Sequence, residues 1–119
     1  MSSEERARRK LLKDLRSGTY SLVILNLLRR EGPMHGYGIM AKIRGATNGV
    51  LSPSESTVYE SLKQLERYKL IRSFWARPEG GGIPRKYYEI TELGIRVLNE
   101  VNNEMASIIK VLSRVIYGG

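Results

Sequence analysis

The chain has 119 residues, of which 41% are hydrophobic, and this suits one domain with a modest core. Its net charge of +8 and isoelectric point of about 10.0 predict an acidic partner, nucleic acid before an anionic membrane. Without cysteine there are no disulfides, and one histidine argues against a zinc site or a catalytic triad, so no metal or cofactor is expected. No apolar run reaches membrane-spanning length and no signal peptide opens the chain, which predicts a cytoplasmic protein.

Three helices are predicted in the first part of the chain. Residues 3–16 are charged with leucines along one side, as in a short amphipathic helix. Residues 20–31 are apolar almost all round, which is typical of a buried helix, and Gly32 and Pro33 end it. Residues 36–44 are predicted to form the third helix, with its apolar residues facing the core.

A fourth helix is predicted to begin directly after residue 52. Ser52 can cap it, Pro53 suits the first helical position, and Glu55 completes a capping box. Apolar residues then recur at i, i+4 and i+7, which predicts one buried stripe. These residues are Val58, Leu62 and Leu65.

From residue 70 onward the pattern changes to that of strands. Residues 70–77 and 85–91 are rich in β-forming residues, and the glycine- and proline-rich residues 78–84 between them predict a hairpin with a flexible tip. Thr91 then caps a long helix that is predicted to reach about Tyr117.

This order of elements is that of a winged helix-turn-helix. The predicted fold class is mainly α with a small β-hairpin, and the chain is expected to have three parts. These are an N-terminal helical arm (residues 1–16), a winged helix-turn-helix domain (residues 17–91) and a C-terminal dimerisation helix (residues 92–119).

The fourth helix has an outer face that suits double-stranded DNA. Its beginning offers hydroxyl and free N–H groups, and a recognition helix enters the major groove with its first turns. Gln64 can pair with adenine, and Lys63 with guanine or a phosphate. The predicted DNA contacts of this helix are Ser54, Ser56, Thr57, Tyr59, Lys63 and Gln64.

Positive charge gathers on both sides of this helix along the chain. Residues 1–16 and 29–44 each carry a net charge of +3, and residues 70–90 carry +2. Such flanking charge suits contacts with the DNA backbone rather than with the bases. The predicted backbone contacts are Tyr37, at the start of the third helix, and Arg77, Arg85 and Lys86 on the hairpin.

The last predicted helix carries a heptad seam. Its apolar residues are spaced 3, 4, 3, 4, 3, and a chain this small cannot easily bury so wide a stripe within itself. We therefore expect a homodimer, whose two-fold axis would place two reading helices on a palindrome, about 34 Å apart or further. The predicted interface residues are Leu11, Leu15, Leu98, Val101, Met105, Ile108, Leu112 and Val115.

Three segments together resemble the PadR family of transcriptional regulators: LVILNLLRREGPMHGYGIMAKI, STVYESLKQLERYKLI and PRKYYEITELGIRVL. The resemblance is to the compact branch of that family. It implies a winged-helix dimer that binds palindromic promoter DNA, usually as a repressor that an effector often releases. The chain departs from the family pattern at Ser56, Glu60 and Lys69, where Gly, Pro and Gly respectively are frequent or usual.

Other functions remain open at this stage. A basic architectural protein that coats DNA without sequence preference would use the same flanking charge and leave the hydroxyls of the fourth helix unused. A winged-helix module with a protein partner would not bind DNA at physiological salt. An enzyme is not expected, because no nucleophile or acid–base pair has a partner. Trp75 is expected to anchor the core, in preference to stacking on a small aromatic effector near the dimer seam.

Overall fold

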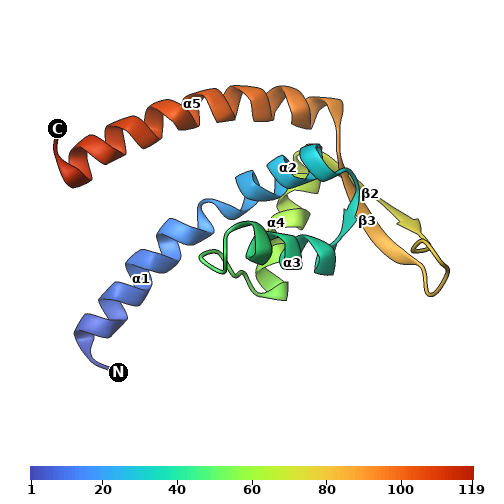
Figure 1. Cartoon of the computed structure of the whole chain (residues 1–119), viewed down its shortest axis with the longest axis horizontal. Coiled ribbons are helices and arrows are strands. Elements are labelled where there is room, and N and C mark those ends of the chain that lie inside the picture. The colour runs from blue at the N-terminus through green and yellow to red at the C-terminus, as the bar shows by residue number, and fades with distance from the viewer.

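The computed structural model describes residues 1–119 and contains five helices and three strands. They are α1 (Ser3–Ser17), α2 (Tyr20–Glu31), β1 (Met34–His35), α3 (Gly36–Ala46), α4 (Glu55–Arg67), β2 (Ile71–Ala76), β3 (Arg85–Ile90) and α5 (Glu92–Tyr117). Helices α2, α3 and α4 form a bundle with the hairpin of β2 and β3 projecting from one side (Figure 1). Helices α1 and α5 leave the bundle on the other side as two diverging arms. The predicted mainly helical winged helix-turn-helix fold is confirmed.

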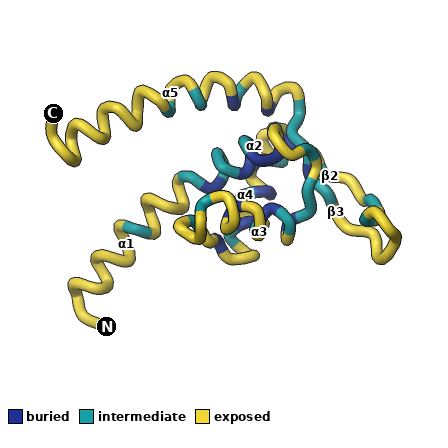
Figure 2. Tube along the Cα trace, in the orientation of Figure 1, coloured by how far each residue is buried: buried dark blue, intermediate teal, exposed yellow.

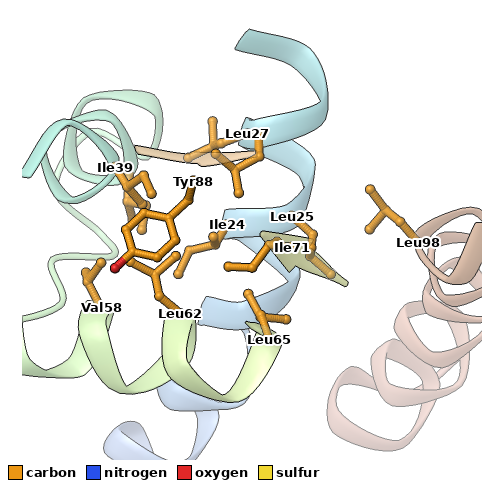
Figure 3. Packing of buried hydrophobic residues seen from close by; sticks show 12 residues of the cluster. Ile24, Leu25, Leu27, Ile39, Val58, Leu62, Leu65, Ile71, Tyr88 and Leu98 are labelled. Carbon is orange, nitrogen blue, oxygen red and sulfur yellow. The ribbon is translucent and has the colours of Figure 1, made fainter. Parts of the chain in front are cut away.

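The core lies where α2 packs against α3, α4 and the sheet. The buried stripe predicted for α4 is confirmed, because Val58, Leu62 and Leu65 all join the core cluster (Figure 3). Helix α2 contributes on several sides, as its almost uniformly apolar sequence predicted. Ile71 and Tyr88 from the sheet complete the cluster. The bundle thus fixes α4 by its inner face and leaves its outer face to solvent.

The N-cap of α4 lies two residues later than predicted. Its N-cap is Ser54, whose hydroxyl accepts a hydrogen bond from the Thr57 amide at 3.2 Å. Ser52 instead donates its hydroxyl hydrogen to the Gly49 carbonyl at 3.0 Å and so closes the preceding turn. Pro53 is buried against the domain. The prediction of a Ser52 cap was therefore wrong, because the turn before the helix uses that hydroxyl.

The sheet has a third strand that the predicted hairpin lacked. Met34 and His35 of β1 pair with Tyr88 and Tyr87 of β3, which gives an antiparallel sheet in the order β1-β3-β2. A strand of two residues has no alternation for a sequence pattern to reveal. Its structural effect is to hold His35, the residue that precedes α3, against the base of the hairpin.

Helix α5 begins as predicted at Thr91. The Thr91 hydroxyl accepts a hydrogen bond from the Gly94 amide at 3.0 Å and donates one to the Lys69 carbonyl at 2.7 Å. Gly94 lies so near the Leu70 carbonyl that a Cβ there would come within 2.1 Å of its oxygen. This contact requires glycine and fixes the start of α5 against the corner between α4 and β2.

Beyond its first turns α5 is largely exposed, and so is most of α1 (Figure 2). None of the helices combines the length and the apolar character that crossing a membrane requires.

Candidate nucleic-acid interface

The residues predicted to read DNA lie together on the outer face of α4. Thr57 is half-buried and the others are exposed, and Lys63 takes part in no ion pair. The hydroxyls cluster at the start of the helix: the Oγ of Ser54 lies 3.2 Å from the Oγ of Ser56 and 2.9 Å from the Oγ1 of Thr57. The leading end of α4 therefore presents hydroxyl groups, and Lys63 and Gln64 follow on the same face about two turns later.

A groove lined by positive side chains runs between α1 and the start of α4. We name it the basic groove; its volume is about 370 Å³. Four bases line it from α1, with Ser54 and Thr57 on the α4 side and no acidic residue in its lining. The bases are Arg8, Arg9, Lys13 and Arg16. None of these side chains was among the predicted DNA contacts, although the i, i+4, i+7 spacing of Arg9, Lys13 and Arg16 in the sequence indicates one helix face.

A second hollow, about 560 Å³ in volume, lies between the start of α3, α4 and the hairpin. We name it the wing hollow. It brings together four predicted DNA contacts, Tyr37, Tyr59, Arg85 and Lys86, although they come from three different elements. Its other lining residues are His35, Gly36 and Trp75. The remaining predicted contact of the hairpin, Arg77, is exposed just beyond β2 and does not line the hollow.

Glycine at position 36 allows Tyr59 to reach across the wing hollow. A Cβ at Gly36 would lie 2.6 Å from the hydroxyl oxygen of Tyr59, so the phenol ring packs directly over the backbone. This packing holds Tyr59 at the edge of the reading face. The first turns of α4 consequently border both the basic groove, through Ser54 and Thr57, and the wing hollow, through Tyr59.

Trp75 does not anchor the core. Its side chain is 70% exposed, it pairs in register with Lys86, and it lines the wing hollow. The expectation from sequence was wrong because the outer half of β2 extends past the bundle, where the core does not reach Trp75 (Figure 1). The hairpin also projects away from the free ends of α1 and α5, so Trp75 does not lie near the predicted dimer seam.

His35 occupies the most constrained position in the wing hollow. Its Nδ1 accepts a hydrogen bond from the Gly38 amide at 3.1 Å, which caps α3, and its Nε2 lies 3.2 Å from Nη1 of Arg85. The His35 and Tyr87 rings pack in a T-shaped arrangement, with their centroids 5.6 Å apart. Partial burial, and then the nearby positive charge of Arg85, lower the pKa of His35 below its usual value. No three His, Cys, Asp or Glu side chains gather anywhere in a way that could hold a metal ion.

The apolar residues predicted for a dimer lie on α1 and α5. Leu11 is 71% exposed and Leu15 65%, and the later heptad residues of α5 are also exposed; they are Val101, Ile108, Leu112 and Val115. Met105 is half-buried. Leu98 is different, because it has no exposed area and belongs to the core of its own chain, so it cannot contribute to a dimer surface. We name the four exposed heptad residues of α5, which are Val101, Ile108, Leu112 and Val115, the apolar stripe.

Comparison with known proteins places the chain in a family. The PadR-like family of transcriptional regulators matches residues 24–100. An uncharacterized protein of Lysinibacillus sphaericus is 31% identical over 105 residues, which cover 88% of this chain and 94% of that protein. The crystal structure of a PadR family transcriptional regulator from Eggerthella lenta matches with a TM-score of 0.79 and 26% identity over 98% of each chain.

A further similar structure contains nucleic acid. Bacillus subtilis PadR, crystallised in complex with operator DNA, is 28% identical with a TM-score of 0.58, over 67% of this chain and 44% of that one. The family match covers the bundle, the hairpin and the start of α5, which are the elements that build the exposed face of α4. The chain therefore belongs to the PadR-like family of transcriptional regulators, which are not enzymes.

Proposed function

We propose that this protein is a sequence-specific double-stranded DNA-binding regulator that acts as a repressor on a palindromic promoter site. The observation that carries the proposal is the exposed, hydroxyl-bearing start of α4 between the basic groove and the wing hollow. A helix that reads bases needs donors and acceptors at its leading end and positive charge beside it. The binding of operator DNA by Bacillus subtilis PadR supports the same function here.

In this proposal α4 lies in the major groove. Ser56 and Gln64 read base edges, and Lys63 contacts guanine or a phosphate. The two flanking surfaces hold the DNA backbone: the bases of α1 lie on one side of the reading face, and Tyr37, Arg85 and Lys86 lie on the other. Arg77, farther out on the hairpin, contacts the backbone beyond the wing hollow.

The functional unit in the proposal is a homodimer formed through the apolar stripe. The stripe and the leucines of α1 are exposed on two arms that leave the bundle on the same side (Figures 1 and 2). A second copy can cover them with the same surface, as a two-fold interface requires. The dimer then presents two reading helices about 34 Å apart or further, the spacing that a palindrome demands. If that palindrome overlaps the promoter, the bound dimer blocks transcription and acts as a repressor.

A small aromatic effector fits a site other than Trp75. An apolar hollow of about 350 Å³ lies where α5 passes α2 and α4, and Leu22, Leu25, Val97 and Val101 line it. A flat apolar ligand in it would contact the base of the apolar stripe and could shift the arms. Screening small aromatic acids and amines by thermal unfolding tests this: a stabilising compound should lose its effect in Val101→Trp, which fills the hollow, and keep it in Ser107→Ala.

The proposed function is tested with the DNA upstream of the protein's own gene. Binding to this fragment and to a shuffled fragment of equal length is measured across a salt series, with the emission of Trp75, the only tryptophan, as one readout. A regulator should prefer its own fragment by about a thousandfold near physiological salt. Equal affinities that both disappear steeply with salt would leave only phosphate neutralisation, which is the architectural alternative.

A further inference from the structure

Two hydrogen-bond donors face each other in the wing hollow without an acceptor between them. The Gly38 amide can only donate, so the Nδ1 of His35 that receives it carries no proton. The neutral ring must then carry its proton on Nε2. This Nε2–H lies 3.2 Å from Nη1 of Arg85, and a guanidinium has donors but no acceptor. The close approach of His35 and Arg85 is therefore not a hydrogen bond within the protein.

The surroundings of this pair favour an external anion as the missing acceptor. No acidic residue lines the wing hollow, while Lys86 and the hydroxyl-bearing Tyr37 and Tyr59 do. The hollow also includes the first residues of α3, where the helix dipole adds partial positive charge. The contact with Tyr87 and the cap on Gly38 hold the His35 ring on both sides, so its free N–H has one direction.

We propose that His35 and Arg85 bind one phosphate of the DNA backbone between them, with His35 acting as a neutral Nε2–H donor. The phosphate oxygens accept from the ring and from the guanidinium, and this removes the opposition of the two donors. The positive charge of Arg85 attracts the phosphate, and the Nε2–H of the fixed His35 ring orients it. The proposal rests on the DNA-binding function above and adds His35 to the residues proposed to contact DNA.

The neutral state of His35 has a measurable consequence. Each cation that neutralises a phosphate releases counterions and adds about 0.9 to the salt slope of DNA binding, whereas a neutral donor adds nothing. Burial and Arg85 lower the pKa of His35, and a second ring proton would have to displace the Gly38 amide from Nδ1. We therefore expect the ring to stay uncharged when it binds the phosphate. The two partners of one phosphate should therefore differ in salt dependence although both contribute to affinity.

The first experiment uses His35→Ser and Arg85→Gln with the upstream DNA fragment. Serine retains a strong N-cap acceptor for α3 but lacks the N–H of the ring, so the helix is preserved. His35→Ser should weaken binding about tenfold at every salt concentration, which gives a parallel line. Arg85→Gln should weaken binding and reduce the slope by about one per reading helix.

Non-additivity identifies the shared phosphate. The double variant His35→Ser/Arg85→Gln should lose less than the product of the two single effects, because both partners serve one ligand. The matched control is Arg77→Gln, an exposed hairpin base outside the hollow, whose effect should multiply with that of His35→Ser. Unchanged affinity in His35→Ser, a reduced slope in that variant, or effects that multiply with Arg85→Gln would each overturn the proposal.

The second experiment does not depend on any operator. His35 is the only histidine, so the ring ¹⁵N spectrum of the intact protein reports it alone. In the free protein Nε2 should carry the proton and Nδ1 should not. DNA should shift the Nε2–H signal more strongly than inorganic phosphate does when the two are added at equal phosphate concentrations. A proton on Nδ1 would remove the donor pair. An equal response to inorganic phosphate would make this a free-anion site and overturn the assignment to the DNA backbone.

These measurements separate this inference from the proposed function. A wild-type protein that prefers its own fragment, together with a His35→Ser variant of equal affinity, refutes only the phosphate site. A wild-type protein without sequence preference refutes the regulator, while the ring spectrum and the parallel salt lines still decide the role of His35.

Discussion

Asn26 of α2 and Asn102 of α5 exchange a pair of amide hydrogen bonds. The Nδ2 of Asn102 donates to the Oδ1 of Asn26 at 3.0 Å, and the Nδ2 of Asn26 donates to the Oδ1 of Asn102 at 3.3 Å. Both side chains are half-buried. Together with the hydrogen bond that Arg29 of α2 donates to Asn99, this pair ties α5 to α2 beyond the start of α5 that Gly94 fixes.

Asn102→Ala should lower the free energy of unfolding by about 1–2 kcal/mol, because the half-buried Oδ1 of Asn26 loses its donor. The Nδ2 of Asn26 still donates to the Leu22 carbonyl at 2.9 Å. Urea unfolding at a fixed protein concentration measures this, since a dimer would make stability depend on concentration. Asn103→Ala, on the exposed side of the same helix, is the control and should have little effect. A double change to Asn26→Leu/Asn102→Leu should recover part of the loss. Equal stability of Asn102→Ala and wild type would show that the pair does not hold α5.

Lys69→Gly should stabilise the protein by about 1 kcal/mol. Lys69 has φ of +62°, a left-handed conformation that costs a residue with a side chain about 1–2 kcal/mol. It occupies the glycine position of a Schellman motif at the end of α4, in which the Leu70 amide bonds the Leu65 carbonyl at 3.0 Å. Thermal unfolding measures the gain. Asn48→Gly, at φ of +51°, is the control and should gain less, because asparagine tolerates this region. An unchanged or lower melting temperature for Lys69→Gly would contradict the prediction.

Leu112→Asp should convert the proposed dimer to a monomer without unfolding the protein. Leu112 is exposed in the protomer, so the aspartate meets water in the monomer and would be buried without a partner in the dimer. Sedimentation velocity and far-ultraviolet circular dichroism measure the two properties. Met105 is a poorer choice, because it also lines hollows against α2 of its own chain. Ser107→Asp should remain dimeric, and a Leu112→Asp protein that still sediments as a dimer would place the interface elsewhere.

Lys13→Gln should weaken binding to all DNA sequences equally and reduce the salt slope by about one per reading helix. Lys13 lines the basic groove beside the start of α4, where it can reach a phosphate. Lys10→Gln is a matched control on the same helix, because Lys10 does not line the groove and pairs with Asp14 at 3.0 Å. Fluorescence anisotropy across a salt series compares the two variants. Equal slopes for both would remove the basic groove from the interface.

Ser56→Ala should relax sequence preference rather than affinity for DNA in general. The expected cost is about 1–3 kcal/mol on the preferred fragment and little on a shuffled one. Ser61→Ala, on the same helix but away from both flanking surfaces, should leave both affinities unchanged. Competition binding with the two fragments measures the ratio. If Ser56→Ala lowers both affinities by the same factor, Ser56 contacts the backbone and the bases are read by other residues.

The sequence by itself determined the helices of this protein, their order and the hairpin between the last two of them. The buried stripe of α4 and the Thr91 cap could be predicted because helical periodicity and capping depend on residues within a few positions of each other. Once the buried stripe of α4 is known, the helical repeat also predicts which residues lie on its exposed outer face. Motifs spread over residues 22–98 were also enough to indicate the family.

Only the tertiary structure decided which neighbours these residues have. The strand β1, the exposure of Trp75, the burial of Leu98 and the meeting of His35 with Arg85, which lies 50 positions away, all depend on contacts between distant segments. Hydrophobic periodicity describes one helix or strand at a time. It does not show where a strand extends past the bundle or which face of a helix another element covers. The exposed polar face of α4 could therefore be predicted from the sequence, whereas the two surfaces that flank it exist only because folding brings α1, α3 and the hairpin beside α4.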